Sequence, residues 1–243
     1  MQSKVIFLIA LTFTALNLFG CSSEASQYPG PASPAASPAP AYPPPQQPAP
    51  PPRTVAPGAT TFFDRAAQAH RAGNLDQALA DYAKAIELDP KYADAYYNRA
   101  IVHEDKGDPD RAIADYSKTI ELDPKNARAY FNRAILYHDR NELDRAIADY
   151  SKALELTPDI RIYLNRGFVY LDKANYDAAL GDFNRVLQLD PNYAGAYYGR
   201  GMVHYHKKLK QPALEDLEKF LQLDPNSPDR ADVEQKIREL KGQ

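Results

Sequence analysis

The segment AIELDP at residues 85–90 recurs in four close variants: TIELDP at 119–124, ALELTP at 153–158, VLQLDP at 186–191 and FLQLDP at 220–225. The final prolines are separated by 34, 34, 33 and 34 residues, so the period is regular apart from one deletion. Each proline disfavours helix at the residue before it and therefore marks a repeated helix end. A period of this length indicates a stack of similar units, none of which can bury its apolar face alone.

Small and flat residues recur with the same period. When Ala59, Ala93, Ala127, Ile160 and Ala194 are taken as position 1, position 8 is always Ala or Gly and position 20 is always Ala. Small side chains there allow two helices to approach closely. Position 4 holds Phe62, Tyr96, Tyr130, Tyr163 and Tyr197, and position 24 holds Tyr82, Tyr116, Tyr150, Phe183 and Leu217.

These markers resemble the tetratricopeptide repeat (TPR) family, whose unit is a hairpin of two helices. The resemblance implies an all-α fold, a right-handed superhelical solenoid of five hairpins, over residues 59–92, 93–126, 127–159, 160–193 and 194–227. Gly73, Gly107 and Asn141 fall where a first helix must stop, and these residue types tolerate the left-handed conformation of a helix C-terminus. Residues 228–243 are expected to form a charged capping helix over the last repeat.

Residues 1–21 are predicted to be an export signal. Lys4 precedes an uncharged apolar run over residues 5–19, which is shorter than the roughly 20 residues that a membrane-spanning helix needs. The end of this segment, Leu18-Phe19-Gly20-Cys21, resembles the lipobox of bacterial lipoproteins, although Phe19 is larger than the residue usual there. The resemblance implies that Cys21, the only cysteine, is acylated. The alternative is an ordinary secretory signal with a chance cysteine.

Residues 22–58 are predicted to be a disordered tether. They contain 13 of the 21 prolines and almost no aliphatic side chains, so they cannot bury enough apolar surface to fold. A plain spacer is favoured over a proline-rich ligand for another domain. Together with the predicted acylation of Cys21, this tether predicts an exported, membrane-anchored protein. Serine directly after the cysteine, here Ser22, resembles the pattern of lipoproteins that are sorted to the outer membrane. This resemblance implies that the protein lies on the periplasmic face of that membrane, if the cell has one.

Arginine at position 7 and aspartate at position 23 occur together in every repeat. The pairs are Arg65 with Asp81, Arg99 with Asp115, Arg133 with Asp149, Arg166 with Asp182 and Arg200 with Asp216. Because the separation is constant at sixteen residues, we predict an ion pair between the two helices of each repeat. A ladder of arginines for an acidic ligand is the alternative, but it leaves the aspartates unexplained.

The TPR resemblance places positions 2, 5, 6, 9, 12 and 13 on or beside the concave wall of the solenoid. Asparagines at position 6 could bind a peptide backbone beside apolar residues at positions 5 and 9. The predicted groove comprises Tyr97, Asn98, Ile101, Phe131, Asn132, Ile135, Leu164, Asn165, Phe168, Tyr198 and Met202. The alternative is that positions 5 and 9 are consumed by packing against the neighbouring repeat.

The sequence shows no motif for a catalytic, metal or cofactor site. The net charge is −3 and no segment concentrates lysine and arginine, so nucleic acid is not an expected partner. A single cysteine provides neither a disulfide framework nor a thiolate metal site. His204 and His206 are two residues apart on a predicted helix, so they diverge and make a poor chelate.

These observations favour a membrane-tethered TPR scaffold rather than an enzyme, with no cofactor. It is expected to bind proteins or peptides of the cell envelope through its groove, in an adaptor or assembly role. The alternative is a self-associating structural component, a homo-oligomer within an envelope complex such as secretion, pilus or outer-membrane assembly machinery.

Overall fold

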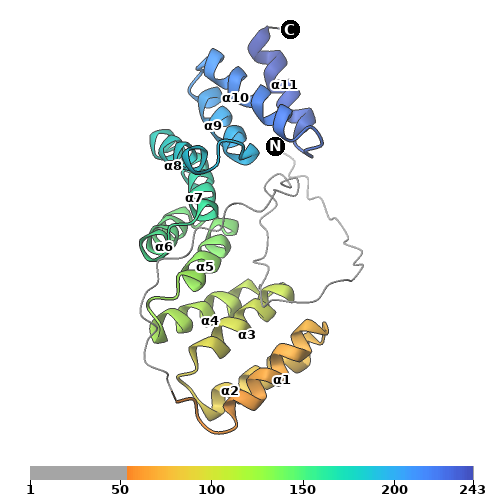
Figure 1. The fold of residues 1–243 in the computed structure, drawn as a ribbon, viewed down its shortest axis with the longest axis vertical. Helices are drawn as coiled ribbons and strands as arrows, with labels where there is room; N and C mark the ends of the chain where they lie inside the picture. Colours follow the sequence, from red (N-terminus) through yellow and green to blue (C-terminus); the bar gives the residue numbers. More distant parts are fainter. Residues whose placement is uncertain (1–53, 243) are drawn as a thin grey trace, which may run out of the picture.

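The computed structural model describes residues 54–242, and this part of the chain forms eleven α-helices and no strand. The helices are α1 (Ala59–Arg71), α2 (Leu75–Leu88), α3 (Ala93–Asp105), α4 (Pro109–Leu122), α5 (Ala127–Asp139), α6 (Leu143–Leu156), α7 (Ile160–Asp172), α8 (Tyr176–Leu189), α9 (Ala194–His206), α10 (Lys210–Leu223) and α11 (Arg230–Lys241). Consecutive helices pair as five hairpins stacked along the molecule, and α11 packs on α10 at the C-terminal end (Figure 1). The predicted all-α solenoid is confirmed.

The predicted signal segment with Cys21, and the predicted tether up to residue 53, lie outside the described residues. The described chain enters the solenoid just before α1. Val55 packs against the core of the first hairpin, and the Ala56 N–H donates a hydrogen bond of 3.4 Å to Oδ2 of Asp89. These last residues before α1, which the sequence assigned to the tether, therefore contact the folded unit.

A left-handed residue at position 15 ends the first helix of every repeat. Gly73 (φ 76°), Gly107 (φ 71°) and Asn141 (φ 59°) occupy this position in the first three repeats. Ala174 (φ 57°) and Lys208 (φ 58°) adopt the same conformation in the last two, although a side chain makes it unfavourable. The turn is therefore kept even where the residue type does not favour it.

The second helix of most repeats ends at an aspartate before the repeated proline. Asp89 is extended, with φ −137° and ψ 90°, as the following proline requires. Its Oδ1 accepts a 3.0 Å hydrogen bond from the N–H of Lys91, and Asp123 accepts one of 3.1 Å from Lys125 in the same way. These aspartates fix the turn into the next repeat.

The core is built from the small and aromatic residues that carry the period. The alanines at position 20 and the rings at position 24 of the first four repeats are buried. Phe183 fits between two glycines, since a Cβ on Gly167 would lie 2.8 Å from its Cε1 and a Cβ on Gly199 would overlap its ring. These glycines therefore allow α7, α8 and α9 to pack closely around one ring.

Candidate protein-binding surface

The eleven residues predicted to line a groove lie on α3, α5, α7 and α9. We call the side of the first helices formed by positions 2, 5, 6, 9 and 13 the first-helix face, because these positions share one side of a helix. Tyr97, Asn132 and Ile135 are buried, with 5, 6 and 5% of their surface exposed. They therefore belong to the packing between helices. For Tyr97 and Ile135, at positions 5 and 9, this is the alternative that the sequence left open, and for Asn132 it corrects the assignment to an open groove.

The other eight predicted residues are partly buried and keep some surface in solvent. They are Asn98, Ile101, Phe131, Leu164, Asn165, Phe168, Tyr198 and Met202. The aromatic rings among them pack on second helices: Phe131 on Tyr150 at 5.8 Å and Phe168 on Phe183 at 5.1 Å between ring centroids. Packing therefore consumes one side of each ring, and only the remaining surface is available to a partner.

The asparagines at position 6 do not form a uniform row. Asn98 donates to the carbonyl oxygen of Asp94 at 2.8 Å, and Asn165 donates to that of Arg161 at 2.9 Å, so both amides lie along their own helix. Asn132 instead turns inward and donates to the hydroxyl oxygens of two tyrosines on α3 and α4. Two of the three predicted amides thus remain at the surface.

All five arginine–aspartate pairs are in contact, each through two hydrogen bonds. In the third repeat, Arg133 Nε lies 2.7 Å from Asp149 Oδ2, and Arg133 Nη2 lies 2.8 Å from Asp149 Oδ1. The same geometry joins Arg65 to Asp81, Arg99 to Asp115, Arg166 to Asp182 and Arg200 to Asp216. The aspartates are buried, so each pair fixes the two helices of its hairpin.

Three of these arginines also hold the preceding repeat. The Nη1 groups of Arg133 and Arg166 donate to Ser117 and Ser151 at 2.9 Å, and Nη1 of Arg200 donates to Asn184 Oδ1 at 2.8 Å. These acceptors all lie on the second helix of the repeat before. The arginines are thus largely committed to internal contacts, which favours the structural role over the acidic-ligand alternative.

A second row of ion pairs between repeats was missed at the sequence level. A cation at position 14 contacts the aspartate at position 18 of the preceding repeat: Arg140 with Asp110 at 2.6 Å, Lys207 with Asp177 at 2.7 Å, and likewise Lys106 with Asp76 and Lys173 with Asp144. The 34-residue period carries this signal, since both positions recur. The pairs are exposed, so each contributes little stability but marks the stacking register.

Position 12 of one repeat meets position 13 of the next at the edge of the first-helix face. Nε2 of His70 lies 2.5 Å from Oδ2 of Asp105, which joins α1 to α3. Nε2 of His138 lies 2.6 Å from Oδ2 of Asp172, which joins α5 to α7. Both contacts pair an acid with a group that can become cationic.

Between the second and third repeats the same two positions hold Glu104 and Asp139, both acids. Burial raises the pKa of Glu104 to about 7, and Asp105 and Asp139 add to this rise, while a hydrogen bond donated by Tyr116 opposes it. Asp139 keeps its side chain exposed, and partial desolvation by the surrounding chain raises its pKa. This interface therefore differs electrostatically from its neighbours.

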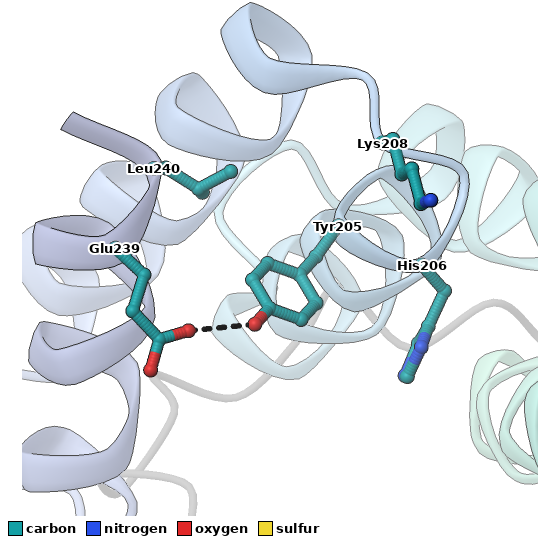
Figure 2. A pocket seen from close by; sticks show the side chains of 5 residues that line it. All are labelled: Tyr205, His206, Lys208, Glu239 and Leu240. Atoms are coloured by element: carbon teal, nitrogen blue, oxygen red, sulfur yellow. Dashed lines mark hydrogen bonds between the residues drawn. The ribbon is translucent and has the colours of Figure 1, made fainter. Parts of the chain in front are cut away.

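The C-terminal end carries a shallow pocket between α9 and α11 (Figure 2). Tyr205 donates a 2.7 Å hydrogen bond to Glu239 across it, and His206, Lys208 and Leu240 complete the lining. This bond raises the pKa of Tyr205 and lowers that of Glu239. The contact fastens the capping helix to the last repeat, which is the simplest role for these residues.

Within residues 54–242, no group of histidine, cysteine and acidic side chains is arranged to hold a metal ion. In the same part of the chain, no helix is long and apolar enough to cross a bilayer.

Regular hairpins, an arginine–aspartate pair in every hairpin and a partly open face define a helical-repeat protein. Three models of the tetratricopeptide repeat match the chain, over residues 70–107, 100–159 and 167–238. The chain therefore belongs to the TPR family. No curated protein matches its sequence.

Several solved TPR structures have a similar fold. YrrB, described as a TPR protein with an unusual peptide-binding site, is 27% identical over 69% of this chain and 87% of its own, with a TM-score of 0.65. MamA is 23% identical over 72% and 94%, with a TM-score of 0.65. PilW, described as a widely conserved type IV pilus biogenesis factor, is 20% identical over 76% and 86%, with a TM-score of 0.64. At these identities MamA and PilW establish the fold alone.

Proposed function

We propose that this protein is a membrane-tethered scaffold that binds protein or peptide partners of the cell envelope through its first-helix face. The observation that carries the proposal is the continuity of this face over α3, α5, α7 and α9. Each of these helices contributes at least one partly exposed apolar or amide side chain at position 5, 6 or 9. Such a surface suits an extended peptide or an amphipathic helix.

The comparison with YrrB supports a peptide or protein ligand, since that relative is described by its peptide-binding site. The arginines at position 7 are engaged with aspartates and do not provide a competing anion site. The ligand is therefore expected to contact the outer edges of Phe131, Phe168 and Tyr198 and the amides of Asn98 and Asn165.

The tethering part of the proposal rests on the lipobox-like segment that ends at Cys21 and on the proline-rich stretch after it. Two or three acyl chains would hold the protein firmly at a membrane, at roughly 0.8 kcal/mol per buried methylene. Metabolic labelling with a fatty-acid analogue should mark the wild type and not Cys21→Ser. An unlabelled wild type would refute the anchor without affecting the binding proposal.

Site-specific photo-crosslinking in the native cell tests the binding surface. A photoreactive residue at Asn98 or Asn165 samples the first-helix face. The matched controls are Ala114 and Ala148, which are exposed on the second helices α4 and α6. We expect adducts with the same partner from the first two positions and not from the controls.

Adducts only from Ala114 and Ala148 would move the binding surface to the second helices and contradict the proposal. Adducts at twice the mass of the chain would support the self-associating alternative instead.

A further inference from the structure

Four polar side chains from three helices form a connected network between the second and third repeats. Asn132 Nδ2 on α5 donates to the Tyr116 hydroxyl at 3.0 Å and to the Tyr97 hydroxyl at 3.3 Å. The Tyr116 hydroxyl, from α4, donates in turn to Oε1 of Glu104 on α3. Tyr97, Tyr116 and Asn132 are buried, whereas Glu104 keeps part of its surface in solvent. A carboxyl group that can exchange protons with water is thus attached to a buried inter-repeat contact.

The neighbouring interfaces show what is unusual about this carboxyl. Where the first repeat has His70 and the third has His138, the second repeat has Glu104. Each histidine meets an aspartate of the next repeat, and either pair can become attractive on protonation. Glu104 has an acid, Asp139, at the corresponding place, so its ionisation adds a like charge to the interface.

The groups around Glu104 make the negative charge costly. On its own helix the neighbours are Tyr97 and Asp105, and Asp105 is also held by His70 from α1. From α4 comes the Tyr116 hydroxyl, and from α5 come Asn132 and Asp139. On α2, Asp76 pairs with Lys106. The lysine and histidines near this carboxyl are engaged elsewhere: Lys106 pairs with Asp76, His70 contacts Asp105 and His138 contacts Asp172. On α5, Arg128 lies over the Tyr97 ring, 5.3 Å from its centroid.

We propose that the contact between the second and third repeats is a proton-operated joint. With a proton on Glu104, the network is neutral and α3 and α4 stay packed on α5. When the proton leaves to solvent, the carboxylate faces Asp105 and Asp139 and the packing loosens. Two repeats lie before this joint and three repeats with the capping helix lie after it, so its opening changes the relative placement of the two ends.

The direction of the effect follows from linkage. Because the pKa of Glu104 rises from 4.5 to about 7 on folding, the closed interface binds this proton more tightly than the open one. The closed state is therefore favoured at low pH and loses this advantage as pH rises from about 4.5 to about 7. From these two pKa values, protection should fall roughly tenfold between about pH 6 and about pH 8.5.

Amide hydrogen exchange of the full chain, read by mass spectrometry and corrected for the intrinsic pH dependence of exchange, tests the joint. Peptides from α3, α4 and α5 should lose protection with rising pH, while peptides from α8 and α9 should not. Glu104→Gln keeps the shape without the charge and should abolish the response.

Asp139→Asn provides a second variant that leaves Glu104 in place, and it should weaken the response without removing it. An identical pH response in wild type and Glu104→Gln would overturn the proposal. So would a response of equal size in α8 and α9, since that would reflect the whole solenoid rather than this joint.

Discussion

Two interfaces between repeats bring position 24 of one repeat against position 6 of the next, but with different residues. At the contact of the second and third repeats, Tyr116 at position 24 accepts a hydrogen bond from Asn132 at position 6 of the next repeat. At the contact of the fourth and fifth, Phe183 occupies position 24 and Gly199 occupies position 6. The phenylalanine ring fills the space that a side chain on Gly199 would need.

The residues at position 24 and at position 6 of the next repeat therefore act as a matched pair. A buried hydroxyl needs a polar partner, whereas a ring without one can pack directly on backbone. The match is not universal, because Asn98 and Asn165 turn toward their own helices. The two interfaces should therefore respond differently to substitutions that leave the shared arginine pairs intact.

The largest effect is expected from Gly199→Ala. Its methyl group would overlap the Phe183 ring, so the free energy of unfolding should fall by about 3 kcal/mol, even though alanine favours helix. Gly181→Ala on α8 is the matched control, because a Cβ there meets nothing within 4 Å, and it should stabilise by about 0.5–1 kcal/mol. Urea unfolding measures both. Equal effects of Gly199→Ala and Gly181→Ala would show that the Phe183 ring does not require glycine at position 199.

Loss of an arginine pair should affect both interfaces alike. Arg133→Ala and Arg200→Ala each leave a buried aspartate, Asp149 or Asp216, without its partner and cut a link to the preceding repeat. Because the arginine side chains are still 17 and 25% exposed, we expect a loss of about 2 kcal/mol from each rather than the full penalty of a buried pair. Thermal denaturation would detect it. A neutral result for either would show that the pair does not hold its hairpin.

A smaller effect is expected from Tyr116→Phe. Removing the hydroxyl deprives Asn132 and Glu104 of their common partner, so stability should fall by about 1 kcal/mol. The converse change, Phe183→Tyr, would bring a hydroxyl to an apolar site beside Gly199 and should also destabilise. If Tyr116→Phe is stabilising, the polar network is not a source of stability in this interface.

The smallest effect concerns the turns, which also differ along the chain. The first two repeats have glycine in the left-handed turn, whereas the last two have Ala174 and Lys208. Lys208→Gly should relieve this strain and raise the free energy of unfolding by about 0.5–1 kcal/mol. Differential scanning calorimetry can resolve such a change. A loss of stability would mean that the Lys208 side chain makes a compensating contact.

Much of the fold was predictable from the sequence, because the repeated proline, the small residues and the rings fix helix ends and helix crossings locally. The pairing of Arg133 with Asp149 and its equivalents followed from the constant spacing of sixteen residues. The row of contacts such as Arg140 with Asp110 could have been found from the same period.

The sequence left open whether Tyr97 and Ile135, at positions 5 and 9, pack against the next repeat, and it did not predict the burial of Asn132. A helical pattern gives the face on which a side chain lies, but the angle between neighbouring hairpins decides how much of that face the next repeat covers. The inward turn of Asn132 likewise depends on Tyr116, which lies on another helix. The same holds for the environment of Glu104, which is shaped by α4 and α5.

The pH dependence of unfolding in urea tests the contrast between the two interfaces most directly. Because folding raises the pKa of Glu104 to about 7, its protonated form stabilises the fold at low pH, and this contribution is lost as pH rises through about 7. Relative to Glu104→Gln, the wild type should lose about 1–2 kcal/mol between about pH 5 and about pH 8, a value reduced for the partial exposure of this group. The exposed Glu121→Gln should follow the wild type. Parallel curves for wild type and Glu104→Gln would contradict the account.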